Sequence, residues 1–171
     1  MFYFRNKFLN KTYRLKLPEI AQPSFVISKD MLALFALSNI HIRETSKLSL
    51  LYSSSLNGFS FEKLALSLKH PGGTLIFLRH TTEGEHLHKS DSVIFGGFSS
   101  RPWIDDSTYS QDDRSYVFSV YPKFQNFFYK IKTGEEAQSN FTYLNTDPRN
   151  GKALGIGSEI VLGDLAGVIV F

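Results

Sequence analysis

The chain has 171 residues, of which 42% are hydrophobic and 15% aromatic, with sixteen Phe. This length and composition suit one folded domain with a sizeable core, and they exclude a chain that is disordered throughout. Cysteine is absent, which excludes thiol nucleophiles, cysteine-rich zinc sites and disulfide bonds. No apolar run approaches the roughly 18 residues that a transmembrane helix needs, so we expect no transmembrane segment.

The net charge of +3 is unevenly distributed. Residues 1–18 hold five basic and no acidic side chains, which leaves 14 basic and 16 acidic ones, a charge of −2, in the rest of the chain. A near-neutral body offers no general attraction for nucleic acid, and we expect no nucleic-acid binding. We interpret residues 1–24 as a basic N-terminal lead-in, with a mitochondrial presequence as the alternative for its acid-free part.

Two helices are predicted in the first half of the chain. Ser28 is a candidate N-cap, and a helix face that packs on a sheet is predicted after it. This face follows the i, i+3, i+4, i+7 spacing through Met31, Leu34, Phe35 and Ser38, and Leu32 and Leu37 widen it. Ser60 is the second candidate N-cap, and a single helical face of the segment that follows carries Phe61, Leu64, Ala65 and Leu68.

Most of the remaining chain is typical of short strands. Leu48–Ser53 predicts a buried strand before an Asn57-Gly58 turn, and Thr74–Arg79 predicts a central strand. Because Gly, Pro, Asn and Asp separate the later apolar runs at close intervals, we predict an α+β, mostly β domain over residues 25–171. Its architecture is a two-layer antiparallel β-sandwich with a few short flanking helices. The later strands are expected at Val93–Phe98, Ser115–Tyr121, Phe127–Ile131, Phe141–Leu144, Ala153–Ile156, Ile160–Leu162 and Val168–Phe171.

One loop gathers possible metal ligands. His80, His86 and His88 lie there with Glu83 and Glu85. Zinc sites usually fix their ligands on rigid, well-spaced elements, whereas this loop is polar and charged, so we interpret it as solvated. We therefore expect no metal and no cofactor, and a metal-dependent or hydrolytic enzyme that uses this loop is kept as the alternative function.

Four aspartates lie in the segment DDSTYSQDD, residues 105–113. Their spacing does not match a calcium loop, and adjacent acids in an extended chain point in opposite directions, so they rarely form a catalytic pair. We expect an exposed acidic loop that faces a partner, together with the hydroxyl groups that precede it. The predicted partner-binding residues are Ser99, Ser100, Asp105, Asp106, Asp112 and Asp113.

Other candidate motifs do not indicate a catalytic or cofactor-binding site. The serine run 53–55 lacks a G-x-S-x-G elbow, and Gly155-Ile-Gly157 lacks the third glycine of a dinucleotide fingerprint. Gly96 and Gly97 lie in an apolar strand and predict a bulge or an aromatic ring packed on bare backbone, for which Trp103 is the candidate. No catalytic residue is predicted.

Five segments give the chain a recognisable order. They are LLYSSSLNGFSF from Leu50, TLIFLR from Thr74, VIFGGFSSRPW from Val93, YVFSV from Tyr116 and ALGIG from Ala153. In this order they resemble the TLDc domain of the eukaryotic oxidation resistance proteins, which is also found beside TBC and LysM domains. The resemblance covers about residues 28–165, and it depends on the order and spacing of segments that are not specific one by one.

The resemblance implies a two-sheet antiparallel sandwich without generally accepted catalytic machinery. It also implies protection against oxidative stress and binding of the vacuolar proton-pumping ATPase (V-ATPase), whereas other members act in trafficking or growth signalling. We therefore expect a non-catalytic interaction domain in the cytoplasm, at the vacuole or lysosome surface, that joins organelle membranes through a protein partner. The absence of cysteine favours protection by interaction over thiol-based scavenging.

The C-terminal end departs from the family pattern. TLDc domains usually continue to a final strand near a Glu-Val-Trp-like end, whereas this chain stops at Phe171 after GDLAGVIVF. The departure favours a domain whose last strands are missing, with an unpaired sheet edge and low solubility as consequences. A truncated, non-functional product is thus a further alternative.

Overall fold

The computed structural model describes residues 2–6, 11–22, 26–80, 93–110, 112, 114–128, 142–147, 149, 153–156, 160–162 and 168–170. Contacts divide the chain into two compact units, Met1–Leu50 and Leu51–Phe171, and each unit is described by itself. Among these described residues, no helix is long and apolar enough to cross a membrane.

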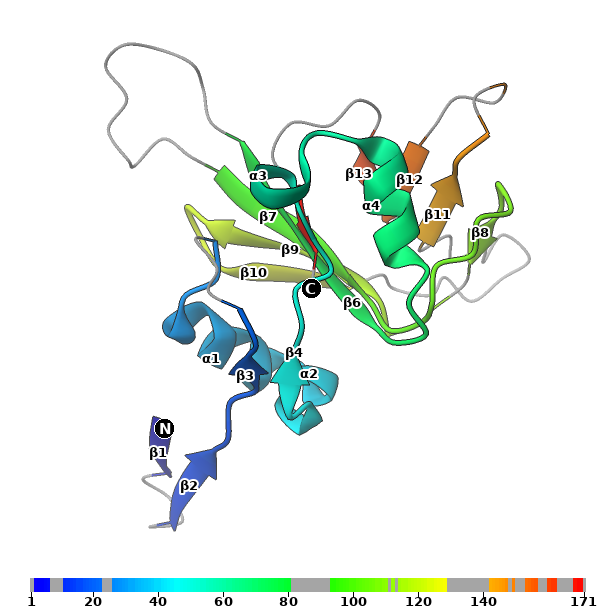
Figure 1. The fold of residues 1–171 in the computed structure, drawn as a ribbon. Coiled ribbons are helices and arrows are strands. Elements are labelled where there is room, and N and C mark those ends of the chain that lie inside the picture. Colours follow the sequence, from blue (N-terminus) through cyan, green and yellow to red (C-terminus); the bar gives the residue numbers. More distant parts are fainter. Residues whose placement is uncertain are drawn as a thin grey trace, which may run out of the picture. The chain divides into compact units, whose positions relative to one another are not determined.

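The first unit contains two short strand pairs and two helices (Figure 1). β1 (Phe2–Asn6) and β2 (Lys11–Leu15) pair in antiparallel orientation within the basic lead-in. β3 (Glu19–Ile20) pairs in parallel with β4 (Lys47–Leu48). A short helix that the sequence analysis did not predict, α2 (Ile40–Glu44), lies between β3 and β4 along the chain.

Helix α1 (Lys29–Ser38) begins where the sequence predicts. The Ser28 hydroxyl accepts a hydrogen bond from the Met31 N–H at 3.2 Å, which confirms the N-cap. The predicted buried face is wrong in part, because Leu34 is 41% exposed. Since apolar side chains surround most of this helix, their spacing alone does not select a face. The buried residues are Leu32, Ala33, Phe35 and Ala36.

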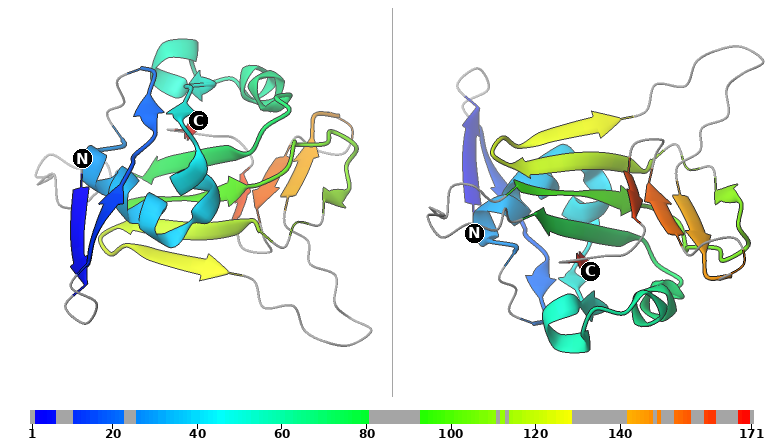
Figure 2. Two further views of the ribbon diagram at one scale, coloured as in Figure 1. Left: turned by 90° about the horizontal axis from the view of Figure 1, so that it is seen from below. Right: turned by 90° about the horizontal axis from the view of Figure 1, so that it is seen from above.

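The larger sheet of the second unit has six antiparallel strands in the order β10-β9-β7-β6-β14-β5 (Figures 1 and 2). The single predicted strand Leu48–Ser53 is wrong, because Leu48 pairs with β3 whereas Tyr52 and Ser53 pair with β14. Long-range pairing thus splits one apolar run. The strands are β5 (Tyr52–Ser53), β6 (Thr74–His80), β7 (Val93–Ser99), β9 (Tyr116–Tyr121), β10 (Gln125–Phe128) and β14 (Val168–Val170).

A second, four-stranded antiparallel sheet has the order β13-β12-β11-β8. Its strands are β13 (Ile160–Leu162), β12 (Ala153–Ile156), β11 (Thr142–Asn145) and β8 (Tyr109–Ser110). The first three lie where the sequence predicts strands. β8 was not predicted, since its two residues lie in a polar segment and become a strand only by pairing with β11.

Two helices, α3 (Ser54–Asn57) and α4 (Phe61–Leu68), follow β5. The N-cap prediction for α4 is confirmed, because the Ser60 hydroxyl accepts a hydrogen bond from the Lys63 N–H. α3 includes Ser54 and Ser55 of the serine run, and it ends at Gly58, whose φ of 78° suits glycine.

Both sheets and α4 bury their apolar side chains in one core. Trp103 lies in this core, and its indole N–H donates a 2.8 Å hydrogen bond to Thr74 Oγ1. This shared core and the antiparallel sheets confirm the predicted mostly β class. The core residues are Tyr52, Leu64, Ala65, Leu68, Ile76, Leu78, Trp103, Leu144, Leu154 and Ile156.

Gly96 and Gly97 permit close packing on the two faces of β7. A Cβ on Gly97 would lie 2.6 Å from Ile156 Cδ1, on the core face. A Cβ on Gly96 would overlap the Ile76 carbonyl oxygen and approach the Phe118 ring to 2.9 Å. The expected ring on bare backbone is therefore present, but it belongs to Phe118 and not to Trp103.

Candidate functional site

The predicted partner-binding residues lie at the end of β7 and in the connection that leads from β7 to β9. Hydrogen bonds fix this connection at two places, one where its ends meet and one at its tip. Of the six predicted residues, Asp113 lies outside the described part of the chain.

The two ends of the connection meet at Asp112. Asp112 Oδ2 accepts hydrogen bonds from the Ser100 N–H at 2.9 Å, from the Ser100 hydroxyl at 2.6 Å and from the Ser115 hydroxyl. Asp112 Oδ1 accepts one from the Arg114 N–H at 3.1 Å. We call Ser100, Asp112 and Ser115 the Asp112 cluster. Its carboxylate joins the start of β9 to the end of β7.

Burial decides what the Asp112 cluster can do. Asp112 is 1% exposed and Ser99 is fully buried, so the expectation that both face solvent is wrong. Burial acts to raise the pKa of Asp112, but the hydrogen bonds from Ser100 and Ser115 outweigh it and lower the pKa below its ordinary value. Asp112 is therefore a charged internal acceptor that fixes the connection.

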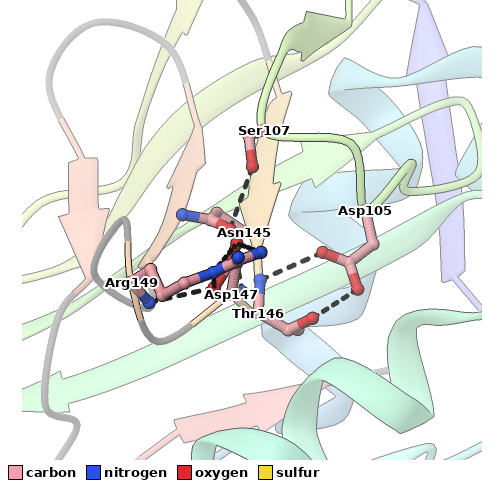
Figure 3. Close-up of polar contacts among 6 residues, drawn as sticks. All are labelled: Asp105, Ser107, Asn145, Thr146, Asp147 and Arg149. Carbon is pink, nitrogen blue, oxygen red and sulfur yellow. Dashed lines mark hydrogen bonds and ion pairs between the residues drawn. The ribbon is translucent and has the colours of Figure 1, made fainter.

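The tip of the connection is attached to the end of β11. Asp105 accepts hydrogen bonds from the Thr146 N–H at 3.0 Å and from the Thr146 hydroxyl at 2.6 Å (Figure 3). The Lys69 ammonium lies 3.8 Å from Asp105 Oδ2. Asp105 thus joins the tip to β11 and to the residue that ends α4.

A second link at the tip runs through Asn145. The Ser107 hydroxyl donates a 3.0 Å hydrogen bond to Asn145 Oδ1, which also accepts from the Asp147 N–H at 2.9 Å (Figure 3). Ser107 has a φ of 61°, a left-handed conformation that is unusual for a residue other than glycine. The buried Asn145 side chain therefore holds Ser107 in an uncommon backbone geometry.

The remaining carboxylates at the tip also have partners within the chain. Asp147 and Arg149 form a two-pronged ion pair, with 2.9 Å between Arg149 Nη2 and Asp147 Oδ2. Asp106 Oδ1 accepts from the N–H and the hydroxyl of Thr108, and these hydrogen bonds lower the pKa of Asp106. Both acids stay ionised near neutral pH, which does not suit a general acid.

Three large side chains at the tip are directed to solvent. Ile104 is 54% exposed, and Tyr109 is 44% exposed although its ring lies 4.9 Å from that of Tyr143. The Arg149 side chain is 87% exposed despite its pairing with Asp147. We call the following set the β8–β11 surface. Its members are Ile104, Asp105, Asp106, Tyr109, Asp147 and Arg149.

The end of β11 and the turn after it contain residues that were not predicted from the sequence. Asn145, Asp147 and Arg149 follow a predicted strand in the segment NTDPRN, whose turn-forming residues were a usable signal. The sequence around this turn does not indicate that it contacts Asp105 and Ser107. That contact needs the parallel bridge between Asp105 and Leu144.

Known catalytic arrangements are not found in the described ranges. There, no group of three His, Cys, Asp or Glu side chains could hold a metal ion. In the serine run, the Ser53 hydroxyl is hydrogen-bonded to that of Ser55 at 2.8 Å. The loop that carries His86 and His88 lies outside the described residues, so the metal-dependent alternative stays a prediction.

Comparison with known proteins gives a family and several relatives. Residues 20–166 match the TLDc domain family. "MTOR-associated protein MEAK7" of Gallus gallus is 32% identical over 114 residues, which are 66% of this chain and 21% of the relative. The protein of the same name from Xenopus laevis is 28% identical over 151 residues, 87% of this chain and 30% of the relative. The Homo sapiens protein is 29% identical over 111 residues, 64% of this chain and 21% of the relative.

The matches establish the family of this chain, but they leave other predictions untested. The chain covers only 21–30% of the relatives' length, so what their name says of the whole protein does not carry over directly. The predicted division at residues 24 and 25 stays a prediction, as does the partner-binding role of the six predicted residues. The family match covers most of the chain and agrees with the antiparallel sandwich. The chain belongs to the TLDc domain family.

Proposed function

We propose that this TLDc-type domain is a non-catalytic docking module that binds a protein partner through the β8–β11 surface. The observation that supports this proposal is the internal pairing of Asp105, Asp106 and Asp147. Carboxylates that already accept hydrogen bonds or form ion pairs within the chain hold the backbone in place, and they have little capacity left for proton transfer. The surface then presents apolar, aromatic and guanidinium groups on a rigid frame, a composition typical of the centre of protein interfaces.

For the partner we propose subunits of the V-ATPase, and for the cellular role protection against oxidative stress. Both come from the family resemblance, and the absence of cysteine supports a role through binding and not through thiol chemistry. The domain would then act in the cytoplasm, at the surface of the vacuole or lysosome. It would reach that membrane through its partner.

A second candidate partner comes from the relatives. Their name describes association with mTOR. Because the chain covers about a fifth of the chicken and human proteins, the mTOR contact of those proteins can equally lie outside the shared region. An experiment should therefore score both partners.

Affinity purification from cells tests the proposal. The wild-type chain should recover V-ATPase subunits above background, and the double variant Tyr109→Ala/Arg149→Ala should lose most of them. Phe127→Ala is the matched control, because Phe127 is 47% exposed but lies on β10 of the other sheet. Recovery of mTOR without V-ATPase subunits would favour the second candidate, and equal recovery by the wild type and the double variant would contradict the proposed surface.

A further inference from the structure

One Asn-Gly dipeptide of the chain lies at the end of α3, in the turn that leads to α4. Asn57 and Gly58 are both exposed, and a Cβ added to Gly58 would have no atom within 4 Å. In such a dipeptide the glycine nitrogen can attack the side-chain carbonyl carbon of the asparagine, because the bond between them closes a five-membered ring. Glycine leaves its nitrogen accessible since it has no Cβ. The turn is therefore a candidate site of covalent chemistry.

The nitrogen of Gly58 is available for this attack. At the C-caps of α1, α2 and α4, the backbone N–H groups of Asn39, Thr45 and Lys69 each donate a hydrogen bond to a carbonyl of the preceding turn. The Gly58 N–H, at the C-cap of α3, has no acceptor among the residues that the structure describes. The nitrogen can therefore lose its proton and approach the side chain without breaking a hydrogen bond of the fold.

The negative charge that develops on the attacking group has a partner. When the Gly58 N–H loses its proton, the charge is shared between that nitrogen and the Asn57 carbonyl oxygen, because both belong to one resonant peptide group. The Lys63 ammonium donates a hydrogen bond to this carbonyl oxygen at 2.9 Å. A cationic donor held at the place where charge develops lowers the barrier of a reaction. Lys63 therefore favours the form of Gly58 that attacks.

The group under attack also has a hydrogen-bond donor in place. The Ser53 N–H donates to Asn57 Oδ1 at 2.8 Å. Attack on Cγ turns this oxygen into an oxyanion, which a backbone N–H stabilises as it does in the oxyanion hole of hydrolytic enzymes. Ser53 is the last residue of β5 and pairs with Ile169 of β14, so its N–H is held by the sheet. The turn thus supplies a donor for each of the two oxygens that gain charge.

We propose that Asn57 modifies itself: it forms a succinimide with Gly58, which water then opens to aspartate or isoaspartate. In the first step the bond between the Gly58 nitrogen and Asn57 Cγ forms and the Cγ–Nδ2 bond breaks. The Nδ2 group leaves as ammonia, and the proton that it needs replaces the one lost by the Gly58 nitrogen. In the second step water adds to one of the two imide carbonyls and breaks its bond to nitrogen. Opening at Cγ gives aspartate, whereas opening at the main-chain carbonyl gives isoaspartate.

Either product changes the turn between α3 and α4. A carboxylate replaces the neutral amide, which adds one negative charge close to the Lys63 ammonium. In isoaspartate the backbone runs through the former side chain and is longer by one methylene. This displaces the Gly58 carbonyl from the Tyr52 hydroxyl, which donates to it at 2.6 Å. Leu56 and Phe59 flank the altered bond and are both exposed, so this part of the surface changes with the age of the molecule.

Peptide mapping by mass spectrometry of the whole chain, incubated folded at neutral pH, measures the rate of conversion at Asn57. Lys63→Met should slow this conversion about tenfold, because it removes a charge-assisted hydrogen bond to the reacting peptide group. Lys69→Met is the matched control, since it removes the other exposed lysine of this region, and it should convert at the wild-type rate. A Lys63→Met variant that converts as fast as the wild type would overturn the proposal.

Unfolding separates the contribution of the structure from that of the dipeptide sequence. In urea the chain keeps Asn57-Gly58 but loses both donors, so the folded wild type should convert about tenfold faster than the unfolded chain. The Asn150-Gly151 dipeptide is an internal reference, and Lys63→Met should leave its rate unchanged. Gly58→Ala should suppress conversion at Asn57, and far-UV circular dichroism establishes that each variant is folded. Conversion that persists in Gly58→Ala, or that is no faster in the folded chain, would contradict the proposed chemistry.

Discussion

Two aspartates in the same connection, Asp105 and Asp112, have the same type of hydrogen bonding but different burial. Each accepts hydrogen bonds from the hydroxyl and the backbone N–H of one residue distant in sequence, Thr146 for Asp105 and Ser100 for Asp112. Asp105 is an exposed residue, with its side chain 22% accessible, whereas Asp112 is buried with only 1% of the whole residue accessible. The acidic segment is therefore not a uniform acidic face. Its aspartates hold the connection in place from positions that differ in burial.

Replacing the buried member should have the largest effect. Asp112→Ala leaves the Ser100 N–H and the Ser115 hydroxyl without their buried acceptor. We expect the free energy of unfolding to fall by about 2–4 kcal/mol, since hydrogen bonds to a buried charged group are costly to remove. Urea unfolding followed by circular dichroism measures it. A loss below about 0.5 kcal/mol, the range of ordinary surface substitutions, would show that the Asp112 cluster does not fix the connection.

The same carboxylate predicts a pH dependence. Because hydrogen bonds lower the pKa of Asp112 in the folded chain, its stabilisation is complete above the ordinary value of 3.8 and is lost as the pH falls below that value. The difference in stability between wild type and Asp112→Asn should therefore be constant near neutral pH and shrink under more acidic conditions. Urea unfolding of both proteins at several pH values tests this. A difference that grows on acidification would have the wrong sign.

Replacing the shallower member should have a smaller effect. Asp105→Ala removes both acceptors of Thr146, but Thr146 can then reach water at the partly exposed tip. We expect a loss of about 1 kcal/mol in the free energy of unfolding. Thr146→Val, which keeps the N–H and removes the hydroxyl, is the matched control and should cost less. A loss as large as that of Asp112→Ala would remove the distinction between the two aspartates.

The smallest effect is expected at Asp106, the neighbour of Asp105. Its carboxylate accepts hydrogen bonds from Thr108, two residues away, and does not link the connection to another strand. Asp106→Ala should leave the melting temperature unchanged within error. Differential scanning calorimetry beside Asp105→Ala checks this, and a similar drop for both variants would mean that the turn itself supports the tip.

Much of the local structure was predictable, and particular residues show why. Ser28 and Ser60 are N-caps because each can accept an N–H from the first turn that follows, a signal confined to a few residues. β6 and β7 are apolar runs bounded by turn residues, and they formed where expected. The sandwich class followed from the number and spacing of such runs.

The candidate site was predicted only in part. The segment 105–113 was found because its aspartates are conspicuous, but nothing local tells that Asp112 is buried and Asp105 is not. Arg149 belongs to the same surface, and the buried Asn145 supports it through its hydrogen bond from Ser107, although both lie about forty residues further along the chain. Their position depends on pairing between β8 and β11, and a two-residue strand such as β8 has no periodicity of its own.

The sequence by itself determined the helix caps, most strands, the mostly β class and the family, because capping and alternation act over a few residues. Only the tertiary structure decided that β14 lies between β6 and β5, that Phe118 and not Trp103 covers Gly96, and which carboxylates are buried. These features depend on contacts between distant segments. These contacts are stabilised by the burial of apolar groups and by the pairing of polar groups between distant segments. A short stretch of sequence contains only one side of each contact and therefore does not reveal it.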